Sequence, residues 1–221
     1  CEQKQDQRIL VFSKTEKFRH TSIPAAKLAI LKLGLDNNYK VDTTENADLF
    51  NETSLKKYTA VVFLHTTGNV LNDKQEQAFK KFIKAGGGYA GIHAAADTEY
   101  DWEWYGKLAG AYFQNHPEIQ AATLNIVDNS HVSTQHLPAK WNRTDEWYNF
   151  KNLNPGVKVI MTIDETSYNG GTMNNNHPMA WYHAYDGGRS FYTALGHTEA
   201  SWSESLFLQH VLGGIKYAMG K

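Results

Sequence analysis

The sequence predicts an α/β fold with a mainly parallel central sheet, and three observations carry that prediction. Short apolar runs rich in β-branched residues alternate with segments of helical periodicity through the first half of the chain. Clusters of glycine, asparagine and aspartate separate these segments. The chain has 221 residues, enough for one domain that buries a core without disulfides or metals. Strands that alternate with helices in this way form a parallel sheet covered on both faces.

The first half of the chain shows strand and helix signals in turn. Ser22 is a suitable N-cap with Pro24 in the first turn, so a helix should begin there and end near Gly34. A triple glycine at 86–88 should stop a second helix. The strands expected in this half are residues 8–13, 39–44, 58–64 and 88–93, and the helices are residues 23–34 and 72–85.

The second half predicts further strands and a closing helix. Asp186 and Gly187 stand between the last two strand-like runs and predict a hairpin. The expected strands are residues 121–127, 157–163, 179–185 and 189–195, and the helix is residues 202–219. Ligands of open α/β sheets bind beyond the carboxyl ends of the strands. The site is therefore expected in residues 13–20, 65–69 and 93–97.

Charge and cysteine content exclude several classes of function. The chain has 22 Lys and Arg against 23 Asp and Glu, with no block of like charge, so nucleic acid is not an expected partner. The only cysteine is Cys1, which excludes an internal disulfide, a thiolate metal cage and a buried thiol nucleophile. No apolar stretch approaches the roughly 18 residues of a spanning helix.

The start of the chain resembles a bacterial lipoprotein after removal of its signal peptide. Cys1 would carry the lipid, and the polar residues up to Gln7 would form a flexible tether to a domain at 8–221. This interpretation predicts a periplasmic or surface protein of the cell envelope that meets the membrane only through that lipid. An artificial chain boundary is the alternative, and the oligomeric state stays open.

Ten histidines, several at predicted strand ends, are the sharpest functional signal. His93 lies between small residues where a strand enters a turn, and this resembles the elbow that exposes a nucleophile or base. His197 and Glu199 form an H-x-E pair in which the carboxylate could orient the imidazole. We therefore expect His93, His197 and Glu199 to be catalytic. The alternative for His93 is a histidine that satisfies buried backbone groups.

Other polar and aromatic residues are candidates for substrate and metal binding. Carboxylates can grip hydroxyl pairs while an aromatic ring stacks on a sugar face, although core packing is the commoner role of a tryptophan. The expected substrate-binding residues are Arg19, His20, Trp102, Asp145, Glu146, His177 and Trp181. A zinc-like divalent ion is a further expectation, although no H-x-x-x-H or H-E-x-x-H pair supports it. Its ligands would come from His20, His93, His177 and His197.

Five segments in order together resemble the ThuA-like family, whose name derives from trehalose utilisation. They are residues 18–20, 86–93, 144–148, 177–181 and 188–197, and the resemblance runs from Arg8 to Lys221. It implies a flavodoxin-like, three-layer sandwich similar to class I glutamine amidotransferases. Where those enzymes carry the elbow cysteine this chain has His93, and in place of their His-Pro-Glu it has His197, Thr198 and Glu199. Loss of the thiol removes amidotransferase chemistry.

The resemblance implies work on a sugar or keto-sugar glycoside. A ring ketone acidifies the neighbouring C–H, so one base and one acid suffice for elimination, hydration or isomerisation. We expect a carbohydrate-catabolic hydrolase, lyase or isomerase that uses histidine acid/base chemistry, with or without a divalent metal. The alternative is a non-catalytic carbohydrate-binding or scaffold lipoprotein, and a ligand-sensing partner of a transporter is a third interpretation.

Overall fold

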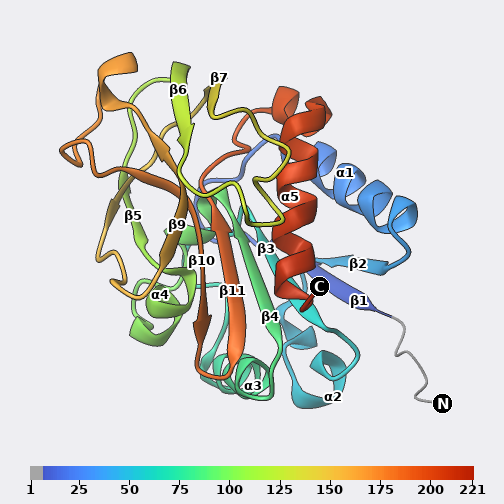
Figure 1. The fold of residues 1–221 in the computed structure, drawn as a ribbon. Coiled ribbons are helices and arrows are strands. Elements are labelled where there is room, and N and C mark those ends of the chain that lie inside the picture. The colour runs from blue at the N-terminus through green and yellow to red at the C-terminus, as the bar shows by residue number, and fades with distance from the viewer. Residues whose placement is uncertain (1–6) are drawn as a thin grey trace.

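The computed structural model describes residues 7–221, which form a nine-stranded sheet with helices on both faces (Figure 1). The strand order is β2-β1-β3-β4-β11-β10-β9-β6-β7. The first five strands are mutually parallel. They are β1 (Arg8–Phe12), β2 (Lys40–Thr44), β3 (Ala60–Leu64), β4 (Gly88–Ile92) and β11 (Gly188–Thr193). The predicted α/β fold with its parallel block is confirmed.

The other side of the sheet is antiparallel. It consists of β10 (Pro178–Tyr185), β9 (Lys158–Ile163), β6 (Gln120–Ile126) and β7 (Lys140–Asp145). β11 joins the two sides, because Phe191 pairs with Ala90 of β4 and with Tyr182 of β10. The hairpin between β10 and β11 turns at Asp186 and Gly187, whose φ angles are 47° and 95°. Both angles are left-handed, as a two-residue hairpin turn requires.

Local sequence explains the main helices. In α3 (Asp73–Lys84), the Asn72 side chain accepts the Gln75 N–H and the Gln75 side chain accepts the Asn72 N–H, so a capping box starts the helix. Pro24 lies in the first turn of α1 (Ile23–Asp36), but the Ser22 side chain makes no capping hydrogen bond, and the helix continues past Gly34. α1 packs on α5 (Ser205–Ala218), and Phe79 of α3 contacts Trp104 of α4 (Glu103–Ala109). The two helix pairs cover opposite faces of the sheet (Figure 1).

Several short elements escape the sequence analysis. No strand was predicted around Asp145, whereas Asp145 is the last residue of the edge strand β7. A two-stranded sheet pairs β5 (Tyr112–Asn115) with β8 (Asn149–Lys151). The remaining helical turns are η1 (Ala47–Leu49), α2 (Glu52–Leu55), η2 (His93–Asp97), η3 (Glu165–Ser167) and η4 (Glu199–Ser203). η4 takes the start of the helix expected at 202–219.

Two expectations concern the chain end and the membrane. Cys1 and nearly all of the expected tether at 1–7 lie outside the described residues, so the lipid anchor stays a prediction. Within residues 7–221, no helix combines the length and the apolar character needed to cross a bilayer.

Candidate functional site

Histidines from distant segments converge where the parallel strands end. His65 directly follows β3, His93 directly follows β4, and His20 and His197 lie in the loops after β1 and β11. Glu146 follows β7 and completes the group. One ligand atom from each of His20, His93, Glu146 and His197 lies within 4.8 Å of the others. We call these four residues the His/Glu cluster, and it occupies the sheet edge that the topology predicts.

His93 presents one ring nitrogen to this cluster. Its Nδ1 lies 2.6 Å from the Ala194 carbonyl oxygen, which can only accept, so Nδ1 carries the proton. Nε2 points the other way, toward Glu146 and His197. The ring is fully buried, and the backbone φ of His93 is 51°, a left-handed value that is uncommon outside glycine. This conformation forms the elbow that the sequence predicts, at the first residue of η2.

Three ligand atoms of the cluster form a nearly equilateral triangle. His93 Nε2 lies 3.2 Å from Glu146 Oε2 and 3.2 Å from His197 Nδ1, and His197 Nδ1 lies 3.1 Å from Glu146 Oε2. Neighbouring ligands of a tetrahedral zinc site with bonds of about 2.1 Å are about 3.4 Å apart. The observed spacing therefore suits two imidazoles and one carboxylate that share a metal ion, a ligand set common in catalytic metal sites.

The electrostatics of the cluster favour a charged Glu146 carboxylate and a neutral His20. Burial alone would raise the pKa of Glu146, but the His197 and His93 hydrogen bonds and charges outweigh it and hold that pKa below its ordinary value. Burial, together with the nearby His93 and His197, lowers the pKa of His20 to about 2. His20 is therefore neutral at physiological pH and keeps a lone pair for a metal.

Two further histidines lie at this edge and were not among the expected site residues. His65 is fully buried, stacks on His20 with ring centroids 4.8 Å apart, and has no hydrogen-bond partner for either ring nitrogen among residues 7–221. Burial, chiefly, lowers its pKa. His116 is exposed, and its Nδ1 lies 3.2 Å from Glu146 Oε1. The signal that could have found His65 is its place directly after a buried strand, which it shares with His93.

Asp145 has a structural role in place of the expected contact with substrate. Its carboxylate is completely buried and accepts the N–H groups of Gly196 at 2.8 Å and His197 at 3.1 Å. Arg143 lies 3.2 Å from the same carboxylate. Asp145 therefore fixes the loop that carries His197, while its neighbour Glu146 points into the cluster.

The expected roles of Glu199 and His177 need correction. Glu199 is exposed at the start of η4, and the carboxylate beside His197 Nδ1 belongs to Glu146. His177 is buried outside the His/Glu cluster, with its Nε2 donating to the Tyr148 carbonyl at 2.7 Å and its Nδ1 2.9 Å from Glu165. It supports Tyr148, whose ring packs 4.1 Å from that of His93. The positions of these residues in the sequence did not predict where their side chains point.

The remaining predicted binding residues have other contacts. Arg19 is exposed and pairs with Glu45 at 2.8 Å. Trp102 stacks on Trp104 with ring centroids 4.8 Å apart. Trp181 is fully buried and donates its indole N–H to the Ala109 carbonyl at 2.8 Å. Trp181 therefore belongs to the packed interior, Trp102 is half-buried and packs against the core, and Arg19 lies in a surface ion pair.

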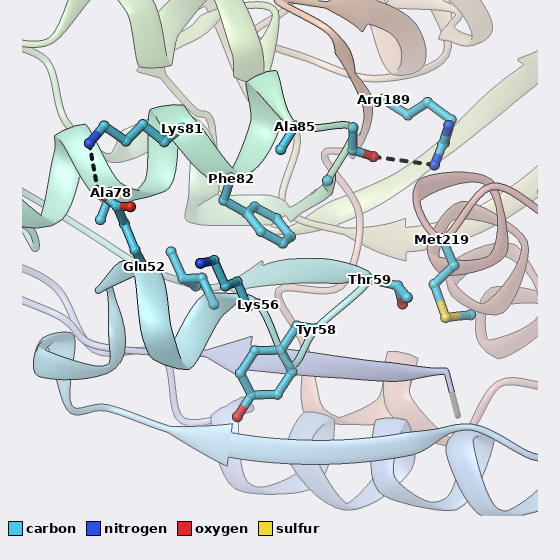
Figure 2. Close-up of a pocket in the computed structure, with 13 residues that line it drawn as sticks. Glu52, Lys56, Tyr58, Thr59, Ala78, Lys81, Phe82, Ala85, Arg189 and Met219 are labelled. Atoms are coloured by element: carbon cyan, nitrogen blue, oxygen red, sulfur yellow. Dashed lines mark hydrogen bonds and ion pairs between the residues drawn. The ribbon is translucent and has the colours of Figure 1, made fainter. Parts of the chain in front are cut away.

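A separate cavity of about 530 Å³ lies at the opposite edge of the sheet, before β3 and β4 (Figure 2). Phe82 and Met219 contribute to its apolar walls, and Lys81 pairs with Glu52 at 2.6 Å beside it. None of the residues expected at the functional site lines this cavity.

Fold and site together define a class: an α/β protein of glutamine amidotransferase-like architecture with imidazoles at the elbow edge in place of a thiol. The family described as ThuA, trehalose utilisation, matches residues 8–218, and the chain belongs to this family. Membership connects the chain with carbohydrate utilisation. Comparison with individual curated proteins gives no match.

Solved structures confirm the fold. A ThuA-like protein from Bacteroides uniformis superposes with a TM-score of 0.81 at 20% identity, covering 96% of this chain and 91% of that one. A ThuA-like protein from Parabacteroides merdae gives 0.76 at 18% identity, covering 97% and 91%. A GMP synthase-type protein from Thermoplasma acidophilum gives 0.55 at 12% identity, covering 96% and 95%. The predicted flavodoxin-like, glutamine amidotransferase-like fold is therefore confirmed.

Proposed function

We propose that this protein is a carbohydrate-catabolic enzyme that acts on a sugar or keto-sugar glycoside with a divalent metal held by His20, His93, Glu146 and His197. The single observation that carries the proposal is the triangle of ligand atoms 3.1 to 3.2 Å apart, with neutral His20 beside it. Membership of a family described by trehalose utilisation supports the choice of a carbohydrate.

The reaction assigns different tasks to the residues of this edge. A bound divalent ion would polarise an oxygen of the substrate, such as a ring ketone. His93 Nδ1 stays hydrogen bonded to Ala194, which fixes the ring orientation and leaves Nε2 for the ion. His116 is the imidazole that exchanges protons with solvent, because its side chain is 42% exposed while its Nδ1 reaches Glu146 Oε1.

Metal analysis tests the site directly. Wild-type protein, His93→Ala and Glu146→Gln are loaded with zinc, manganese or cobalt, dialysed, and measured by elemental mass spectrometry. Wild type should retain about one ion per chain, and both variants should lose most of it, because each lacks one corner of the triangle. Glu103→Gln, which changes an exposed carboxylate of α4, is the matched control.

Turnover of a panel of glycosides and their keto derivatives, with and without chelator, tests the activity. Loss of turnover on chelation and in the two site variants supports the proposal. If wild type retains no more metal than Glu146→Gln, the metal site is refuted. Sugar binding without any turnover would instead favour the non-catalytic carbohydrate-binding alternative.

A further inference from the structure

A polar hollow of about 720 Å³ lies at the same sheet edge as the His/Glu cluster. Loops that follow β1, β3 and β4, together with β5 and β8, contribute its walls. The polar part of its lining includes Lys17, Asn69, Asp97, Tyr100, Asp101 and Lys151. We refer to this depression as the polar hollow.

The polar hollow adjoins the cluster through three neighbouring pieces of chain. η2 begins at His93 of the cluster and ends at Asp97 of the hollow. Lys17 of the hollow precedes Phe18, an exposed residue whose ring lies edge-on to His20 at 4.8 Å.

Phe113 makes the third connection. It lines the hollow, and its ring packs 4.3 Å from that of Tyr148. Tyr148 in turn packs 4.1 Å from His93, so a single aromatic side chain separates the hollow from a metal-binding ring.

The side chains of the hollow suit an uncharged, hydroxyl-rich ligand. Lys17 and Lys151 are donors, and their ammonium groups lie 5.3 and 4.9 Å from the Tyr100 ring centroid. Asp97 and Asp101 are acceptors; the Tyr100 hydroxyl donates to Asp97 at 2.7 Å, and the Asn69 amide donates to Asp101 at 2.8 Å. Charges of both signs are interspersed, so neither an anion nor a cation is selected.

Adjacent donors and acceptors of this kind match the paired hydroxyls of a sugar. The cavity at the opposite edge differs, because apolar residues contribute much of its lining (Figure 2). We infer that the polar hollow binds the second sugar unit of a glycoside whose first unit lies at the His/Glu cluster. This inference rests on the proposed function and specifies its substrate class as an oligosaccharide or disaccharide.

Calorimetric titration of the metal-loaded protein tests the inference. The probes are methyl glucoside, a set of α- and β-linked glucose disaccharides, and the singly oxidised keto derivative of each. Wild type should bind at least one disaccharide probe about tenfold more tightly than the matched monosaccharide. Asp101→Asn and Lys151→Met should remove most of that preference and leave monosaccharide binding unchanged.

Lys158→Met is the matched control, because Lys158 also lies over a tyrosine ring, that of Tyr182, but outside the hollow. Equal affinity of wild type for monosaccharides and disaccharides, with the metal bound normally, would refute the second-sugar site alone. A protein that binds neither metal nor any sugar would refute the proposed function, and the second-sugar site with it.

Discussion

Left-handed backbone recurs among non-glycine residues at the functional edge. The φ angles of His65, His93 and Glu99 are 51°, 51° and 55°. Such conformations cost of the order of 1 kcal/mol or more each and persist where surrounding contacts over-determine them, often at active sites. At Glu99 those contacts are visible, because one carboxylate oxygen accepts the N–H groups of Val70 and Leu71 at 2.8 Å each.

Glu99 predicts a pH dependence of stability. Burial raises its pKa to about 7, against an ordinary 4.5, although the two backbone hydrogen bonds oppose that shift. Between these values the folded protein holds a proton that the unfolded chain has lost, so this contribution to stability falls as pH rises from 4.5 to 7. Glu99→Gln keeps an acceptor oxygen but cannot ionise, so its stability should not fall in this way. Relative to wild type, its free energy of unfolding should rise by up to about 3 kcal/mol between pH 4.5 and 7.

Urea denaturation at pH 4.5, 6 and 8 measures the effect. Glu103→Gln, at an exposed carboxylate, corrects for general changes in charge. A stability difference between wild type and Glu99→Gln that stays constant with pH would contradict the prediction.

Variants of His20 and His177 test whether the metal ligands are those that the structure brings together or those that the sequence predicted. The sequence placed both among candidate metal ligands, whereas only His20 belongs to the His/Glu cluster. His20→Ala should weaken zinc affinity at least about tenfold, since a direct ligand is lost and the loss of outer partners alone costs roughly 10- to 100-fold. His177→Gln should retain one zinc per chain. Competition titration with a chromophoric chelator measures both, and equal losses would count against the assignment.

Position in the α/β pattern identified most of the cluster from sequence. His20, His93 and His197 were singled out because each follows a predicted strand, and parallel strands end at one edge. Glu146 was expected beside the substrate and lies among them. The prediction that Glu199 orients His197 was wrong, because η4 begins at Glu199 and its side chain is exposed. The place of His116 beside Glu146 could not be predicted from the sequence, since the strand β5 that precedes it was not predicted.

At the scale of elements, uniformly apolar strands were predictable and polar edge strands were not. β3 is buried throughout and reads as a continuous apolar run. β7 alternates exposed and buried positions, but Arg143 and Asp145 occupy two of the buried ones and pair with each other. An ion pair on the inward face removes the apolar alternation that marks a strand, so the sequence looked irregular there.

Close packing of α5 on the sheet predicts an intolerant glycine. A Cβ on Gly88 would overlap the carbonyl of Ala218, and backbone on both sides leaves little room to adjust. Gly88→Ala should destabilise the protein by about 3 kcal/mol and lower the Tm by roughly 6 to 12 °C. In Gly156→Ala the nearest atom would be Asn154 Oδ1 at 3.3 Å, so this control should change little. Differential scanning calorimetry measures the Tm of both variants, and similar Tm values would show that Gly88 is not limited by its packing against Ala218.

At the scale of the molecule, the cluster connects segments that are far apart in the chain. His20, His93, Glu146 and His197 come from four distant segments of the chain, so an ion bound to all four would stabilise the whole fold by mass action. Zinc at about 100 times its dissociation constant should add about 2.7 kcal/mol and raise the Tm by roughly 5 to 10 °C. Chelator should reverse the rise, and Glu146→Gln should show none. Magnesium, which prefers oxygen ligands, should have little effect.

The central place of β11 also bears on how the protein matures during synthesis. β11 holds the parallel and antiparallel strands together, and the loop after it supplies His197. While residues 188–197 are still inside the ribosome, β4 and β10 lack their common neighbour and the ligand set lacks one imidazole. On the proposed function, the metal site of a nascent chain would therefore be complete only at the end of translation, after both halves have been made.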